Sequence, residues 1–372
     1  MIYLDNAATG GFKPRASVET AETVMKFLCA NPGRSGHRLS VTGERIIFGA
    51  REVFSKELNC SANRVIFTKN CTEALNLAIF GTLKVGGHII TTVYEHNSVL
   101  RPLYALKKRG LISLDIVEPW ADKPLSESIK EKITDDTYLV ITTAVSNVTG
   151  EVLPVNEIGE MLKGYKIKYL VDGAQGGGHI KLSLGNGINM IAFAGHKGLC
   201  GIMTSGVLAF DDNTEIEPVL FGGTGTESYN PDQPATYPER LEAGTLNLPA
   251  IASLKEGAEY AFRNLKDFSE NLYLSTERII AELNATENAE VFSLPNPAGI
   301  AAFRLKNTPS SEVADILNSE FDIAVRSGLH CAPLLHKFLG TADEGLVRVS
   351  LAVQNGSREI DSFLRAIKKI AR

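Results

Sequence analysis

The chain has 372 residues, of which 44% are hydrophobic and 22% are charged, and its formal net charge is -5 at pH 7. This composition is typical of a globular protein with room for two domains, and it gives no reason to expect nucleic acid or a membrane surface as a partner. The five cysteines, Cys29, Cys60, Cys71, Cys200 and Cys331, are scattered and form no C-x-x-C pair. We therefore expect no disulfide framework and no metal cluster, and a place in the reducing cytoplasm.

The first element with a chemical signature is a helix predicted from residue 71 to residue 80. Asn70 precedes this run, and Glu73 follows three residues later, which is a capping pattern that marks a helix start. Free backbone N–H groups and the positive end of the helix dipole bind phosphate. We expect a phosphate group near Cys71 and Thr72, with the Thr72 hydroxyl as a further donor.

A buried strand is predicted next, at residues 87–93, followed by an amphipathic helix at residues 99–106. His96 lies between them, at the end of the strand. An imidazole there can lie flat against the ring of a cofactor. The alternative for His96 is a surface or capping residue.

The short apolar run 169–171 ends in Asp172, which small residues and Gln175 follow. A carboxylate at the end of a buried strand can keep a heteroaromatic nitrogen protonated, as the pyridine ring of pyridoxal phosphate (PLP) requires. The alternative is an aspartate that only starts a turn before the glycines.

A further apolar run, 188–193, leads into Ala194-Gly195-His196-Lys197-Gly198, and no carboxylate adjoins the lysine. Burying an unpaired ammonium is costly, whereas an amine with a lowered pKa is a nucleophile that forms Schiff bases. Lys197 is therefore a candidate catalytic residue. The alternative is a lysine that snorkels to solvent at a strand end.

These strand and helix ends predict one ligand site. In an open α/β sheet of the doubly wound kind, ligands bind outside the carboxyl ends of the parallel strands. The later part of the chain adds a long loop at 221–238, helices at 253–265 and 270–283, strands at 299–303 and 346–350, and a last helix after Ser357 as N-cap.

The motifs of the chain, taken in order, resemble those of the class V aminotransferase group, which contains the cysteine desulfurases and selenocysteine lyases. The resemblance runs from Tyr3-Leu4-Asp5-Asn6-Ala7-Ala8-Thr9 to Arg348-Val349-Ser350-Leu351-Ala352. It implies the α/β PLP-dependent transferase fold type I, with a mainly parallel seven-stranded sheet in a large domain (15–249). The smaller α+β domain would comprise residues 1–14 and 250–372.

The resemblance also implies how PLP is held. Lys197 would form the Schiff base, Asp172 would contact the pyridine nitrogen, Gln175 would lie near the phenolic oxygen, and His96 would stack on the ring. The phosphate would be bound by Thr72, backbone groups beside Cys71, His196 and Thr245, the last in a segment, Arg240 to Thr245, that reaches across a homodimer interface.

For the substrate carboxylate, the resemblance implies Arg348 as a bidentate partner, with Asn147 and Arg326 beside it. One departure concerns Ala194, because desulfurases often have a serine there. A hydroxyl donor to the phosphate is then missing.

The segment Arg326-Ser327-Gly328-Leu329-His330-Cys331-Ala332-Pro333 resembles the one whose cysteine accepts sulfur in desulfurases. We predict that Cys331 takes sulfur from L-cysteine as a persulfide and leaves L-alanine. A protein acceptor of unknown identity would take the sulfur on, for example for iron–sulfur cluster assembly.

Several alternatives remain open. Cys331 could be a small buried hydrophobe, and the enzyme could act on L-selenocysteine or catalyse aminotransfer or epimerisation instead. A P-loop nucleotide enzyme is excluded, since the sequence holds no Gly-Lys pair. A non-catalytic scaffold would be expected to lack one of Lys197, Asp172, His96 and Cys331, and all four are present.

Overall fold

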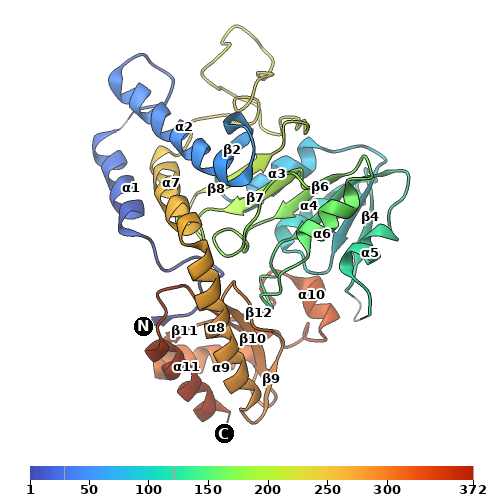
Figure 1. Cartoon of the computed structure of the whole chain (residues 1–372), viewed down its shortest axis with the longest axis vertical. Coiled ribbons are helices and arrows are strands. Elements are labelled where there is room, and N and C mark those ends of the chain that lie inside the picture. Colours follow the sequence, from blue (N-terminus) through green and yellow to red (C-terminus); the bar gives the residue numbers. More distant parts are fainter. Residues whose placement is uncertain (29, 120–121, 372) are drawn as a thin grey trace.

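The computed structural model describes residues 1–28, 30–119 and 122–371, so Cys29 lies outside the described residues (Figure 1). A seven-stranded sheet in the order β2-β8-β7-β6-β5-β3-β4 forms the centre. Its strands are β2 (Val65–Thr68), β3 (His88–Thr92), β4 (Ser113–Val117), β5 (Thr137–Thr143), β6 (Lys168–Asp172), β7 (Met190–Ala194) and β8 (Gly206–Phe210). Only β8 pairs antiparallel to its neighbours, so the predicted mainly parallel sheet is confirmed.

The sequences of the central strands are mostly apolar because helices cover both faces of the sheet. Every residue of β3, β5, β7 and β8 is buried. Along β7, Ile191 and Phe193 pack with α2 (Arg38–Leu58), α5 (Leu125–Lys130), α6 (Val155–Leu162) and α7 (Leu248–Arg263). Met190 and Ala192 pack on the opposite face with α3 (Cys71–Gly81) and α4 (Asn97–Lys108).

A second, antiparallel sheet has the order β12-β13-β10-β9. It comprises β9 (Ala289–Val291), β10 (Ile300–Leu305), β12 (Arg326–Gly328) and β13 (Leu346–Ser350). Helices α8 (Leu265–Asn284), α9 (Ser310–Phe321) and α11 (Ser357–Ile370) pack against it around a separate apolar core. The short strands β1 (Ile2–Tyr3) and β11 (Ile323–Ala324) pair in parallel beside it.

The two sheets are joined by consecutive helices, α7 and α8, which run from the central sheet to the smaller one in Figure 1. Helix α7 packs on α1 (Arg15–Phe27) and α2, beside the central sheet. The domain boundary at 249/250 stays a prediction, and these contacts favour a boundary at Asn264, between α7 and α8.

Three predicted element ends are corrected. Helix α7 begins at Leu248, before the predicted residue 253, because the Asn247 side chain accepts from the backbone N–H of Ala250. Helix α8 begins at Leu265 rather than at residue 270. The N-cap of α11 is Gly356 rather than Ser357, because Gly356 is extended and its N–H donates to the Glu359 carboxylate.

The predicted long loop is confirmed: within the described chain, residues 211–247 between β8 and α7 contain neither helix nor strand.

None of the helices described has the length and apolar character needed to cross a bilayer.

Candidate active site

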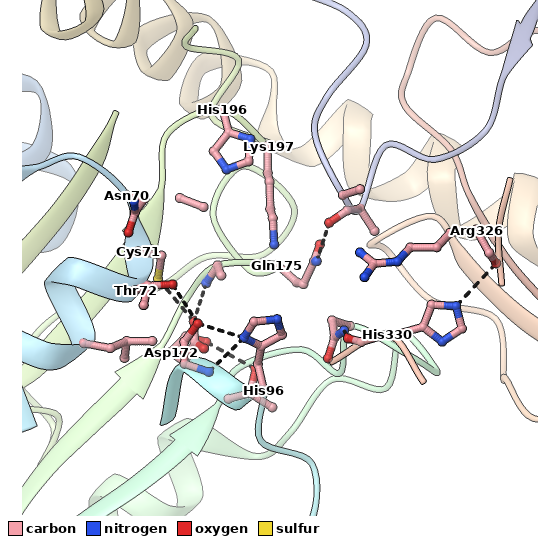
Figure 2. A pocket seen from close by; sticks show the side chains of 18 of the residues that line it. Asn70, Cys71, Thr72, His96, Asp172, Gln175, His196, Lys197, Arg326 and His330 are labelled. Atoms are coloured by element: carbon pink, nitrogen blue, oxygen red, sulfur yellow. Dashed lines mark hydrogen bonds between the residues drawn. The ribbon is translucent and has the colours of Figure 1, made fainter. Parts of the chain in front are cut away.

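A cavity of about 220 Å³ lies at the carboxyl edge of the central sheet. It brings together ten of the predicted site residues: Cys71, Thr72, His96, Asn147, Asp172, Gln175, His196, Lys197, Arg326 and Arg348. Figure 2 shows the Lys197 amine near the middle, with the start of α3 on one side and Arg326 on the other. Ala7 and Ala8 of the N-terminal segment also line the cavity.

The N-terminus of α3 opens into this cavity, as the capping pattern predicts. The Asn70 side chain accepts from the backbone N–H of Glu73 at 3.0 Å, and the Glu73 carboxylate accepts from the N–H of Lys69. The Thr72 hydroxyl shares a hydrogen bond of 2.8 Å with the Ser98 hydroxyl. This helix end offers donors for an anion.

His96 combines the two roles considered for it, because it caps α4 and also lines the cavity. Its Nδ1 accepts from the backbone N–H of Ser98 at 3.0 Å, so any ring proton is on Nε2. Burial, together with the nearby Lys197 and Arg326 cations, lowers the pKa of His96 to about 4. The ring is therefore neutral near pH 7.

Asp172 and Lys197 both line the cavity, and each group influences the pKa of the other. Asp172 ends β6, and its Oδ1 accepts from the Ala174 N–H at 2.9 Å and from the Cys71 thiol at 3.5 Å. Burial raises the pKa of Asp172. Burial also lowers the pKa of Lys197, against the opposing effect of Asp172. A lysine whose pKa is lowered holds more of its neutral, nucleophilic form near pH 7.

Two further predicted cofactor residues contact the N-terminal segment. The Gln175 side chain donates to the backbone carbonyl of Ala7 at 2.8 Å. His196 Nδ1 and the Thr9 hydroxyl are hydrogen-bonded at 3.0 Å. Burial, with the cations of Lys197 and Lys13 nearby, lowers the pKa of His196 to about 4.

Arg348, predicted to bind a carboxylate, is 1% exposed and already has protein partners. Its Nη2 lies 2.8 Å from Asp5 Oδ1, and its Nη1 donates to the Asn147 carbonyl at 2.9 Å. Its Nε has no hydrogen-bond partner among the described residues. The Asn147 side chain donates to the His330 carbonyl at 2.7 Å. Among the residues described, Arg326 forms no ion pair with a carboxylate, and its Nη2 contacts the Cys331 thiol instead.

Cys331 lies beside the cavity and is absent from the residues that line it. Its thiol accepts from Arg326 Nη2 at 3.7 Å, and Arg326 does line the cavity. The Cys331 carbonyl accepts from the Asn97 N–H at 2.8 Å, next to His96. Arg326 thus links the thiol to the cavity.

The loop that carries Cys331 is strained. His330 and Cys331 have φ of 49° and 58°, a left-handed conformation that is uncommon outside glycine and often found at functional sites. The His330 ring stacks on His336, and burial lowers the pKa of His330 to about 2. His330 is therefore neutral, and it also lines the cavity beside Arg326.

Thr245 does not reach the cavity of its own chain. It is exposed and lines a surface groove beside α1 and α7. Nearby, the Glu242 carboxylate forms a buried ion pair with Arg51 at 2.5 Å. The segment with Thr245 is thus held against the body of the protein while Thr245 faces outward.

The sequence did not predict the contacts that Asp5, Thr9 and Lys13 make with residues of the site. It also did not predict Ser98, which lines the cavity and is hydrogen-bonded to Thr72. Asp5 and Arg348 are 343 positions apart, and no spacing rule connects them. The one available signal was that residues 3–9 belong to an ordered motif.

The fold and the cavity define an α/β enzyme whose ligand site lies at the carboxyl edge of a mainly parallel sheet, beside a buried lysine. The chain belongs to the aminotransferase class-V family, whose model matches residues 2–363.

Relatives in this family carry a common name. A protein of Methanothermobacter thermautotrophicus named probable cysteine desulfurase is 31% identical, over 100% of this chain and 94% of its own. One of Pyrococcus abyssi with the same name is 32% identical, with coverage of 100% and 94%. Among solved structures, the apo cysteine desulfurase of Thermococcus onnurineus superposes with a TM-score of 0.92 at 31% identity, covering 100% of this chain and 94% of that one.

Proposed function

We propose that the protein is a PLP-dependent cysteine desulfurase that converts L-cysteine to L-alanine and takes the sulfur as a persulfide on Cys331. The observation that carries the proposal is the contact of the Cys331 thiol with Arg326, a residue of the cavity that contains Lys197. A plain aminotransferase has no use for a thiol there. Relatives named cysteine desulfurases, aligned along the whole chain, support the same activity.

The cavity fits PLP by the chemistry of its donors. The open N-terminus of α3 and the Thr72 hydroxyl suit a phosphate. The buried Asp172 suits a pyridine nitrogen, and the Lys197 amine suits an aldehyde. When bound, PLP supplies an electron sink for the electron pairs left on the substrate carbons.

The residues around the proposed PLP position would transfer the protons and bind the substrate. The neutral Lys197 amine takes the proton from the substrate Cα and returns one to carbon. Neutral His96, which lines the cavity, would offer its flat face to the ring of PLP. Arg348 and Arg326 bind the substrate carboxylate, with Asp5 keeping the Arg348 guanidinium in place.

The sulfur step belongs to Cys331. Its thiolate forms a bond to the substrate sulfur, and the Cβ–S bond breaks with its electron pair left on carbon. That carbon takes a proton and becomes the methyl group of L-alanine. Cys331 holds the transferred sulfur as a persulfide, which a protein acceptor, or a thiol reductant in vitro, then removes.

The test is to incubate the PLP-loaded protein with L-cysteine and a thiol reductant and to quantify sulfide and alanine together. We expect the two products in equal amounts. Alanine without sulfide, or no product at all, contradicts the proposal. L-Selenocysteine is assayed in parallel, and turnover of that substrate alone would make the protein a selenocysteine lyase.

We also propose a homodimer in which Thr245 of each chain completes the phosphate site of its neighbour. The support is the outward-facing Thr245 on a segment held by the Arg51–Glu242 ion pair. The four described cysteines are free, which supports a reducing compartment, the cytoplasm.

Replacing Thr245 with Ala should therefore weaken PLP retention about tenfold, the effect of losing one hydrogen bond to a charged group. PLP loss during dialysis, followed by visible absorbance, measures this. Thr308→Ala, in a turn of the smaller sheet, is the matched control. If light scattering shows that the fully active protein is a monomer, the proposal of a site shared between two chains is excluded.

A further inference from the structure

Residues 9–13 of the N-terminal segment pack on the peptide group that joins His196 to Lys197. The His196 carbonyl accepts from the Gly10 N–H at 2.9 Å and from Lys13 Nζ at 3.0 Å. Lys13 Nζ also donates to the Gly10 carbonyl at 2.7 Å. The ammonium of Lys13 thus ties this segment to the residue directly before Lys197.

The approach leaves little room for a side chain at position 10. A Cβ atom there would lie 3.0 Å from the Lys197 carbonyl oxygen and 3.2 Å from Lys13 Nζ. Such distances are tighter than most Cβ contacts, so a side chain would shift the segment and the Lys197 backbone apart by a few tenths of an ångström. Gly10 and Lys13 therefore both support the contact between the N-terminal segment and the backbone of His196 and Lys197.

Lys13 has no carboxylate partner among the residues described, where its ammonium meets backbone carbonyls instead. Burial of this group lowers the pKa of Lys13. A partly buried cation without a counter-charge costs free energy unless its hydrogen bonds repay it. The two carbonyls, those of Gly10 and His196, supply such hydrogen bonds.

We propose that Lys13 is a positioning residue for Lys197. Lys13 Nζ and the Gly10 N–H both hold the His196 carbonyl. They thereby fix the backbone direction of Lys197, which follows the end of β7 by three residues. The amine of Lys197 is then presented to the cavity in one orientation. The importance of this orientation for PLP rests on the proposed function, whereas the backbone contact does not.

The experiment compares Lys13→Met, which keeps an unbranched apolar side chain as far as the ε position but removes the ammonium, with Lys13→Arg, which keeps the charge and the donors. Lys26→Met is the matched control, since Lys26 lies on the exposed side of α1 and, among the residues described, pairs with Glu22. Two readouts are measured. One is hydrogen–deuterium exchange of the peptide 194–201 in PLP-free protein, and the other is the rate at which the visible band appears after PLP is added.

For Lys13→Met we expect about tenfold faster exchange in this peptide and about tenfold slower appearance of the band, the effect of losing a charged hydrogen bond. Lys13→Arg should restore most of both, and Lys26→Met should change neither. If Lys13→Met does not fold, Lys13→Leu, which is also neutral and has no hydrogen-bond donor, replaces it.

Unchanged exchange and an unchanged rate in the folded variant would overturn the proposal, as would equal losses in Lys26→Met. Faster exchange with an unchanged rate would also overturn it, because Lys13 would then stabilise the segment without positioning Lys197. If the wild type itself binds no PLP, the proposed function fails. The exchange readout still decides whether Lys13 holds the Lys197 backbone.

Discussion

Replacing Lys197 with Ala should abolish the borohydride-reducible link between the chain and PLP. It should also lower L-cysteine turnover by about a thousandfold or more, since loss of a positioned proton-transfer group alone costs about 10² to 10⁴. Lys197 is buried with a lowered pKa and lies in the cavity with Asp172. Alanine supplies neither the amine nor a base.

The measurement is mass spectrometry of the borohydride-treated protein, with sulfide release assayed on the same preparation. Lys163→Ala is the matched control, because Lys163 is an exposed lysine that pairs with Glu160 at the end of α6. It should keep the reducible link and normal turnover. A wild-type protein that stays colourless when PLP is supplied would contradict the assignment of Lys197.

Replacing Cys331 with Ser should leave PLP binding and the spectral response to L-cysteine intact, because those depend on Lys197 and on the substrate Cα. Sulfide release should fall by at least about a hundredfold, because the substitution removes the nucleophilic thiol that accepts the sulfur. A hydroxyl is a poor nucleophile toward a thiol sulfur and cannot hold a persulfide.

A limiting pulse of L-cysteine followed by peptide mass spectrometry checks the same step. The wild type should gain one sulfur atom on the Cys331 peptide and on no other cysteine peptide. Cys60→Ser is the control, since Cys60 packs against the core at the end of α2 and lies outside the residues that line the cavity. Near-normal desulfuration by Cys331→Ser refutes the persulfide role, while loss of sulfur release with selenium release retained indicates a selenocysteine lyase.

The strands and helix ends that build the cavity could be predicted from the sequence, because each has a strong local signal. Residues 188–193 are apolar since β7 is covered on both faces, and the element begins and ends within two residues of that run. Asn70 caps α3 by a side-chain hydrogen bond formed within four residues of sequence. Signals of this kind do not depend on the rest of the fold.

Some helix starts were predicted less well, although local hydrogen bonds cap these helices too. Ser357 has the right chemistry for an N-cap, yet Gly356 occupies that position because Glu359 accepts its N–H. Helix α7 begins five residues before the predicted residue, because Asn247 caps it by accepting from the Ala250 N–H.

By itself, the sequence determined the central sheet, the carboxyl edge at which a ligand binds, and the residue types gathered there, since burial on both faces and helix capping leave local patterns. Only the tertiary structure decided which distant residues meet. Arg348 is engaged by Asp5, His96 both caps a helix and faces the cavity, Cys331 lies beside the cavity in contact with Arg326, and Lys13 holds the carbonyl before Lys197. Such contacts join parts of the chain through packing and hydrogen bonds, which no local pattern encodes.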